Sequence, residues 1–268
     1  MEIVIDIQKV GKVYASERGP VHALENFSMQ VQKGDFAAIV GPSGCGKTTL
    51  LWGLTGLHPF TAGVAYILGK KVELPRREVG IVFQQANLLP WRNMIQNITF
   101  PLEIMKEDLK AYEERVRDLI ASVELSGFES HYPRELSGGM QQRASIVRAL
   151  SFDPDVLLMD EPFGALDAQT RLLMQELLIR VWESHRLTVL FVTHDVDEAV
   201  FISDRVVVMT NRPGTVKEEV TVDLPRPRAF ELQATQEFLA LRSRVLASIR
   251  EETLRSDVSI SPGGGVSR

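Results

Sequence analysis

The chain has 268 residues, of which 44% are hydrophobic and 24% are charged, values typical of a globular protein with one large or two modest domains. The formal net charge is -5 and the sequence has no basic stripe, which excludes a nucleic-acid-binding face as the main function. No apolar run approaches the roughly 20 residues that span a bilayer, and the amino terminus does not resemble a secretion signal. We therefore expect a cytoplasmic chain. With a single cysteine, it cannot form an intrachain disulfide.

The first segments predict an antiparallel β layer. Residues 2–7 alternate between apolar and polar side chains, and residues 23–31 have the pattern of another half-buried strand. Between them, Tyr14 lies beside a polar loop that contains glycine. Its ring can stack on an adenine base or fill the core, and the local sequence leaves both interpretations open.

The segment GPSGCGKTT follows an apolar strand at residues 36–40 and precedes a helix at 50–57, which is the context of a phosphate-binding loop. Its glycines allow the backbone N–H groups to turn inward, and the helix start adds the positive end of its dipole. The lysine can reach the β and γ phosphates and the first threonine can ligate Mg²⁺. The alternative is a glycine turn with an incidental lysine, and the cysteine is either a reactive thiol or a small tolerated residue. The expected nucleotide-binding residues are Gly41, Pro42, Ser43, Gly44, Cys45, Gly46, Lys47, Thr48 and Thr49.

Residues 64–68 and 79–83 predict two strands, and the second leads directly into a polar and then apolar segment. Gln84 can bring its amide oxygen to Mg²⁺ or to an attacking water, or it is an ordinary residue at a strand end. The run Leu88, Leu89, Pro90 and Trp91 is too apolar for a solvated loop, so it either packs into a core or contacts another protein.

Residues 107–123 have the apolar spacing of an amphipathic helix. A second helix, at 144–150, follows the sequence LSGGMQQR. Ser137, Gly138 and Gly139 in this segment can form a second phosphate site with free N–H groups at the helix start. The alternative is an ordinary serine N-cap with a flexible glycine lead.

Residues 156–159 are continuously apolar, as in a strand buried on both faces of a parallel sheet, and they end in two carboxylates. Asp160 can hold Mg²⁺ and Glu161 can accept a proton from the water that attacks the γ phosphate. The structural alternative is a polar strand end with a turn at Pro162.

A similar strand at residues 187–193 ends in His194, whose imidazole can sense the γ phosphate or be purely structural. Asp167 is a good N-cap for a helix at about 168–184. Asp160 lies 113 residues after Lys47, far more than one βαβ unit of about 30 residues, so we expect an inserted helical subdomain at about 87–150.

The motifs GPSGCGKTT, LSGGMQQR, LLMDEP and ALD, together with Gln84 and His194, resemble in their order the ATP-binding subunits of ABC transporters. The resemblance covers about residues 2–225 and implies an α/β fold with a P-loop NTPase core, an N-terminal antiparallel β layer and an inserted helical subdomain. It implies an ATP-binding domain over residues 1–225. Beyond the resemblance, the charged residues predict a helical extension at 226–256, and the SPGGGVSR end predicts a disordered tail at 257–268. The segments FQQANLLPW and HDVDEAVFISDRVVVM, with the turn RPG at 212–214, are similar to subunits that energise import of nitrate, aliphatic sulfonates or taurine and related small organic compounds.

The resemblance implies an ATPase that uses ATP and Mg²⁺ and works as a homodimer with two ATP molecules between its subunits. Lys47 and Glu161 of one subunit then face Ser137 and Gly139 of the other. Catalysis would use Glu161, His194 and Lys47. The resemblance further implies that Tyr14 stacks on adenine, that Gln84 senses Mg²⁺ and the membrane partner, that Asp167 couples the two sites and that His194 positions the γ phosphate. Metal ligands would be Thr48, Gln84 and Asp160.

The expected partner is an integral membrane permease that docks near Leu88–Trp91, with a periplasmic or extracellular binding protein acting indirectly. The chain would then be peripheral on the cytoplasmic face of the inner membrane. Importers of other small solutes share these motifs, so a different substrate stays open. A soluble ABC ATPase in DNA repair or translation is disfavoured because the sequence has one motif set and a negative charge, and a non-catalytic scaffold is disfavoured by the intact catalytic residues.

Overall fold

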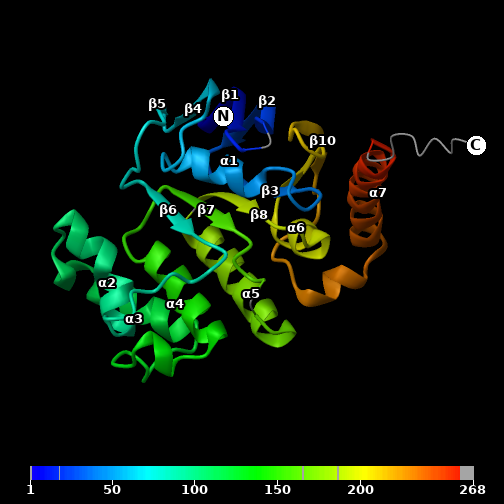
Figure 1. The fold of residues 1–268 in the computed structure, drawn as a ribbon. Helices are drawn as coiled ribbons and strands as arrows, with labels where there is room; N and C mark the ends of the chain where they lie inside the picture. The colour runs from blue at the N-terminus through cyan, green and yellow to red at the C-terminus, as the bar shows by residue number, and fades with distance from the viewer. Residues whose placement is uncertain (1, 18, 165, 186, 260–268) are drawn as a thin grey trace, which may run out of the picture.

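The computed structural model describes residues 2–259 except 18, 165 and 186, so residues 260–268 of the expected disordered tail lie outside the described residues. Figure 1 shows an α/β molecule in which helices cover a central sheet. The strands are β1 (Ile3–Tyr14), β2 (Val21–Gln32), β3 (Phe36–Val40), β4 (Ala62–Ile67), β5 (Lys70–Lys71), β6 (Val79–Val82), β7 (Val156–Asp160), β8 (Thr188–Val192), β9 (Arg205–Met209) and β10 (Val216–Thr221). The helices are α1 (Lys47–Leu54), α2 (Met94–Met105), α3 (Leu109–Ser122), α4 (Gly138–Leu150), α5 (Ala168–His185), α6 (Val196–Ile202) and α7 (Gln236–Ser259), with 3₁₀ turns at Pro133–Glu135 and Phe230–Ala234.

The central sheet has the strand order β10-β9-β3-β8-β7-β6, in which β9, β3, β8, β7 and β6 run parallel. Every residue of β3, β7 and β8 is buried, as expected for strands with packing on both faces. Because parallel strands end at the same edge of a sheet, the segments that follow β3, β6, β7, β8 and β9 meet along one line. This edge positions the functional site.

A second, antiparallel sheet with the order β2-β1-β4-β5 covers one side of the molecule. Its strand β1 runs to Tyr14, well past the residue 7 expected from the alternation, because the hairpin with β2 continues through several register shifts. Apolar side chains of this sheet, of α1 and of one face of the central sheet share a buried cluster. The α1 helix is therefore fixed from both sides.

The helices α2, α3 and α4 lie between β6 and β7 in the chain and form a lobe on the other side of the sheet (Figure 1). The expected amphipathic helix is α3, with Val116, Leu119 and Ile120 buried. The α2 helix was not predicted individually from sequence; it begins at a capping box formed by Asn93 and Gln96. All three helices contribute to a buried cluster that includes α5, α6 and α7.

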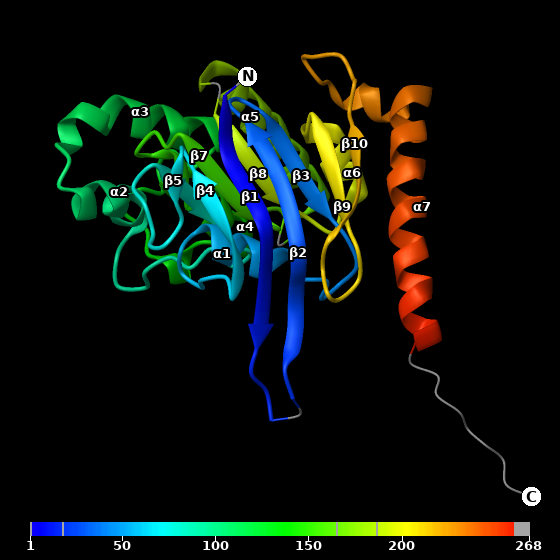
Figure 2. The ribbon, with the colours of Figure 1, turned by 90° about the horizontal axis from the view of Figure 1, so that it is seen from above.

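The carboxyl-terminal helix α7 stands beside β9, β10 and α6, at the end of the sheet opposite to the α2–α4 lobe (Figure 2). Its residues Phe238 and Val245 are buried in the main core. Among the residues that the structure describes, no helix has the length and apolar character needed to cross a membrane.

Candidate nucleotide-binding site

The loop between β3 and α1 opens onto a cavity of about 560 Å³ at the carboxyl edge of the sheet. The backbone here requires glycine: Gly44 and Gly46 have φ of 75° and 109°, and an added Cβ at Gly46 would lie 2.7 Å from the Ala23 carbonyl oxygen. The loop leads directly into the first turn of α1, where free N–H groups favour anions. The lining residues are Ser43, Gly44, Gly46, Lys47, Thr48, Thr49, Gln84, Glu161, His194 and Arg212.

Lys47 is folded back onto its own loop. Its Nζ donates hydrogen bonds to the carbonyl oxygens of Gly41 at 2.9 Å and of Pro42 at 3.0 Å, and the residue is almost fully buried. Cys45 has no exposed surface, and this burial raises the pKa of its thiol above the ordinary value. A buried thiol with a raised pKa is a poor nucleophile, so Cys45 is a small packing residue of the loop rather than a reactive group.

Thr48 and Asp160 bring oxygen ligands together beside the phosphate loop. The Thr48 hydroxyl donates to Asp160 Oδ1 at 3.1 Å, which joins the start of α1 to the end of β7. Burial, with a smaller contribution from the Glu161 charge, raises the pKa of the Asp160 carboxyl. A buried carboxylate with a raised pKa favours a nearby cation, and hydroxyl and carboxylate oxygens are ligands that Mg²⁺ accepts.

Glu161 has an unusual backbone conformation, with φ of 45° in the left-handed region. For a residue other than glycine this conformation costs about 1–2 kcal/mol, and such strain is concentrated at functional sites. The conformation turns the carboxylate into the cavity, where Oε2 lies 3.0 Å from His194 Nδ1 and accepts from Gln84 Nε2 at 3.1 Å. Gln84 after β6 and His194 after β8 therefore both contact the carboxylate of Glu161, which follows β7.

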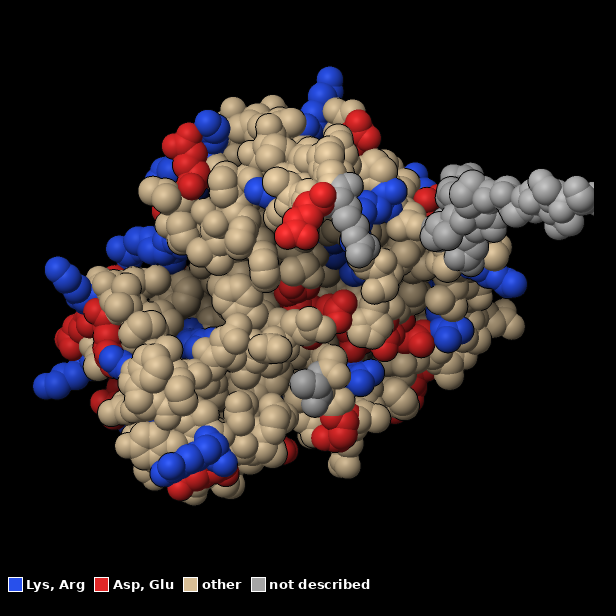
Figure 3. All heavy atoms as spheres, in the orientation of Figure 1, with Lys and Arg blue, Asp and Glu red and all other residues tan. Residues whose placement is uncertain are grey.

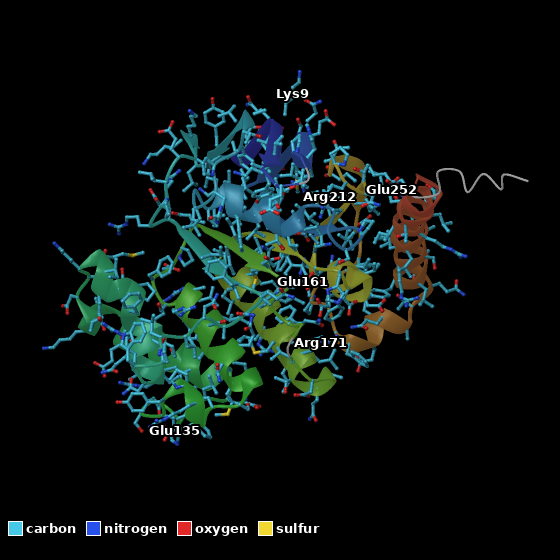
Figure 4. The ribbon with its side chains drawn as sticks, in the orientation of Figure 1. Lys9, Glu135, Glu161, Arg171, Arg212 and Glu252 are labelled. Carbon is cyan, nitrogen blue, oxygen red and sulfur yellow. The ribbon has the colours of Figure 1, made fainter. Side chains whose placement is uncertain are left out.

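The surface around this carboxylate is acidic on the face shown in Figure 3, where aspartate and glutamate side chains gather near its middle. Figure 4, in the same orientation, labels Glu161 in that region, with Arg212 between it and the upper part of the molecule. Arg212 brings positive charge to the cavity, and its Nε and Nη2 donate to the Gly44 carbonyl oxygen at 3.0 and 2.7 Å. In the sequence, Arg212 stood out only as the first residue of the RPG turn, with no predicted contact to the phosphate loop.

Tyr14 lies at the edge of the phosphate loop, with its hydroxyl 3.5 Å from Thr49 Oγ1. Its ring is half-buried rather than part of the core. Asp167 accepts hydrogen bonds from the backbone N–H groups of Gln169 and Thr170 and from the Thr170 hydroxyl, and so caps α5. Neither residue lines the cavity of its own chain.

Ser137, Gly138 and Gly139 form the start of α4, away from the cavity. The Ser137 hydroxyl accepts from Met140 N at 3.2 Å, so it is an N-cap. Ser137 and Gly138 are exposed, and an added Cβ at Gly138 would meet nothing within 4 Å. The second phosphate site expected here is not joined to the first within one chain.

A buried polar network behind His194 was also missed from the sequence. Glu198 of α6 is 6% exposed and accepts from the Thr193 hydroxyl at 2.8 Å. Arg171 of α5 lies 3.6 Å from Glu198 and 3.5 Å from Asp195, and donates to the Leu166 carbonyl oxygen. Burial, opposed by the hydrogen bond from Thr193, raises the pKa of Glu198 to about 7.

The apolar run after Gln84 divides between the two interpretations given by the sequence. Leu88 packs against the main core, whereas Trp91 is 70% exposed. Asn97, with no exposed surface, fixes the turn between them: its Oδ1 accepts from Leu89 N and its Nδ2 donates to the Leu89 and Arg92 carbonyl oxygens.

A groove of about 410 Å³ opens beside this turn, between β6, α2 and the end of α4. Its lining is mostly apolar and includes Leu89, Phe100 and Ile104, the last of which is exposed. The guanidinium of Arg148 closes one side by donating to the Asn87 and Ala86 carbonyl oxygens. The α4 helix thus holds the segment that follows Gln84.

Residues 24–164 match the ABC transporter family. An uncharacterized ABC transporter ATP-binding protein of Methanocaldococcus jannaschii is 45% identical over 256 residues, covering 96% of this chain and 95% of the relative. An aliphatic sulfonates import ATP-binding protein of Bacillus cereus is 42% identical over 244 residues (91% and 95%), and a nitrate import ATP-binding protein of Synechocystis is 40% identical over 252 residues (92% and 95%). A solved dimeric ATP-binding cassette in a post-hydrolysis state with ADP and Pi has a TM-score of 0.74 and 33% identity, covering 82% of this chain and all of that chain.

Proposed function

Because the chain belongs to the ABC transporter family, as an ATP-binding protein and ATPase, we propose that it energises the import of a small anion through a membrane permease. The observation that carries the ATPase part of the proposal is the meeting of Lys47, Glu161 and His194 around one cavity at the carboxyl edge of the sheet. Asp160 is joined to this cavity by its hydrogen bond from Thr48. The residues come from segments far apart in the chain, and each matches a role in phosphoryl transfer to water.

ATP supplies the bond that is hydrolysed, and Mg²⁺ supplies charge neutralisation for its phosphates. The site residues fit both. The glycine loop and Lys47, whose Nζ now contacts two loop carbonyls, would hold the phosphate chain. Thr48, Asp160 and Gln84 would hold the metal. No group of three or more His, Cys, Asp and Glu side chains that could bind a metal exists in the described part of the chain, so the remaining ligands would be phosphate and water oxygens.

Glu161 is the proposed general base, with Oε2 accepting the proton from the attacking water. The hydrogen bond from Gln84 and the contact with His194 hold this carboxylate in place. His194 is mostly exposed and so is available to a γ phosphate as well. Tyr14, at the edge of the loop, would stack on the adenine ring.

Two copies of the chain would close the site. At the start of α4, Ser137 and Gly138 are exposed and Gly139 is half-buried. None of them lines the cavity of its own chain, which supports their use by a second copy. The free N–H groups of this helix start would face the γ phosphate of the partner, and Asp167 would lie between the two sites. Because both chains would then share each ATP, binding would favour the closed dimer and hydrolysis would release it.

The permease would dock at the groove beside Leu89, next to the exposed Trp91. The apolar lining suits one short amphipathic helix of a membrane protein. Gln84 donates a hydrogen bond to Glu161 and lies five residues before Leu89 in the chain. A displacement of Glu161 would therefore reach the groove through Gln84 and the short segment that follows it. Docking would make the chain peripheral on the cytoplasmic face of the membrane.

The substrate proposal is nitrate, a sulfonate or a taurine-like anion, imported with the help of an extracellular or periplasmic binding protein. Its support is the similarity, over most of both chains, to proteins named for import of aliphatic sulfonates and of nitrate. Radiolabelled uptake of these anions in the host, with and without the gene, separates this class from other small solutes.

The docking proposal predicts that the double variant Leu89→Ser, Trp91→Ser loses its membrane partner. A tagged chain would be purified from detergent-solubilised membranes of its host, and proteins with several membrane spans would be identified by mass spectrometry. Leu74→Ser, at an exposed leucine that does not line the groove, is the matched control. Retention of the partner by the double variant, with ATP binding intact, would contradict docking at this groove.

A further inference from the structure

The segment 210–215, which we call the RPG loop, joins β9 to β10 and lies against the phosphate loop. Since β9 runs parallel to β3 as its neighbour, both loops leave the sheet at the same edge. Arg212 donates twice to the Gly44 carbonyl oxygen, at 3.0 and 2.7 Å. Gly214 packs so closely that an added Cβ would collide with the Cys45 carbonyl. The contact between the two loops is therefore both polar and steric.

The RPG loop is rigid by its own hydrogen bonds. Thr210 N donates to the Thr215 carbonyl oxygen at 2.9 Å, and the Thr210 hydroxyl donates to the Pro213 carbonyl oxygen at 3.1 Å. The Asn211 side chain accepts from Arg212 N at 2.8 Å. A rigid loop transmits a displacement of Asn211 to the Arg212 guanidinium.

The far side of the loop is held by the carboxyl-terminal helix. Glu252 of α7 is 4% exposed, and its Oε2 accepts from Asn211 N at 3.2 Å while its Oε1 lies 3.1 Å from Lys217 Nζ. Figure 4 shows Arg212 between Glu252 and Glu161. A chain of contacts thus runs from α7 through Asn211 and Arg212 to the phosphate loop.

The contact with Gly44 bears on phosphate binding because a peptide unit is planar. The Gly44 carbonyl and the Cys45 N–H belong to one peptide unit and point in opposite directions. Holding the Gly44 carbonyl oxygen therefore also fixes the direction of the Cys45 N–H, which donates to the Pro42 carbonyl oxygen across the loop. Gly44 itself has φ of 75°, so without Arg212 this flexible residue has other peptide orientations available.

We propose that Arg212 is a positioning residue that presets the phosphate loop for ATP, and that Glu252 of α7 holds Arg212 in place, so that the carboxyl-terminal helix sets nucleotide affinity. The guanidinium suits this role because its planar fork can donate two hydrogen bonds to one carbonyl, which an ammonium group cannot reproduce. The inference rests on ATP binding at this cavity.

The test is a double-mutant cycle on the Kd of ATP, measured by titration calorimetry in EDTA so that no hydrolysis occurs. Arg212→Ala should raise the Kd about 3- to 10-fold, as expected for losing a charge-assisted contact at a partly exposed site. Arg212→Lys should recover less than half of this loss. Glu252→Ala should raise the Kd about 2- to 5-fold alone, and should add almost nothing when combined with Arg212→Ala.

A matched control breaks a different contact between α7 and the β9–β10 hairpin. Glu218 of β10 pairs with Arg244 of α7 at 3.2 Å, without touching the RPG loop, so Glu218→Ala should leave the Kd unchanged. The Tm of each protein without nucleotide separates a loss of stability from a loss of affinity. In steady-state hydrolysis, Arg212→Ala should raise KM by the same factor while kcat stays within about twofold.

Two results would overturn the inference. One is an unchanged Kd in Arg212→Ala, and the other is a full additional effect of Glu252→Ala in the Arg212→Ala background. Failure of the unsubstituted chain to bind ATP would instead contradict the assignment of the cavity.

Discussion

The buried carboxyl of Glu198 predicts a specific dependence of stability on pH. Burial raises its pKa to about 7 in the folded chain, from an ordinary value of 4.5. Between these values the folded chain keeps a proton that the unfolded chain has lost, so stability falls as pH rises through this window. At about 1.4 kcal/mol for each pH unit, the total is about 3 kcal/mol. Glu198→Gln should remove this loss.

The assay is urea unfolding of both proteins at several pH values from 5 to 8. The free energy of unfolding of Glu198→Gln, relative to the unsubstituted chain, should rise by about 2.5 kcal/mol across this range, because part of the window lies below pH 5. This difference already includes the attraction between Arg171 and Glu198, 3.6 Å apart, because that attraction lowers the folded pKa of Glu198. The charged groups that face Glu198 are Asp195, Arg171 and His194.

Glu113→Gln on the exposed face of α3 is the control, since that glutamate pairs only with exposed Arg117 among the contacts described here. Its stability should follow the unsubstituted chain at every pH. Parallel curves for Glu198→Gln would refute the reasoning, because they would mean that Glu198 has the same pKa in the folded and unfolded chains.

Two further substitutions test the site and the turn beside it. Asn97→Ala leaves buried backbone groups of Leu89 and Arg92 without their partner, and should lower the free energy of unfolding by about 2–4 kcal/mol in urea titrations; a loss below about 0.5 kcal/mol would contradict the role of Asn97. Glu161→Gln should reduce phosphate release from Mg-ATP by roughly 10²- to 10⁴-fold with little change in the Kd of ATP, and an unchanged rate would exclude Glu161 as the base.

The sequence was most informative where short-range rules apply. The predicted family and the predicted ABC ATPase fold are confirmed. They could be predicted because a glycine loop of this kind between a strand and a helix is typical of phosphate binding, and because buried parallel strands appear as apolar runs in the sequence. The two carboxylates at the end of β7 and the histidine after β8 stood out because polar groups at the end of buried strands need a reason.

The residues that were missed act through long-range contacts with backbone groups. Arg212 binds a carbonyl oxygen 168 positions away, and nothing in its own neighbourhood of sequence indicates that partner. Asn97 sits inside a helix with apolar neighbours and supports a turn eight residues earlier. Glu198 resembles any glutamate in the first turn of a helix until α5 covers it. Such roles follow from tertiary packing, which single-sequence patterns do not encode.

The α4 helix has a mechanical consequence. Gln142 and Arg148 fasten it to the segment after β6, its carboxyl end borders the docking groove, and Ser137 caps its opposite end. Its 13 residues span about 20 Å, so a tilt of about 10° at the groove would move the Ser137 end by roughly 3 Å. That distance is the difference between making and breaking a hydrogen bond to phosphate. In the proposed assembly, α4 is a lever by which a membrane protein on one subunit gates the nucleotide of the other.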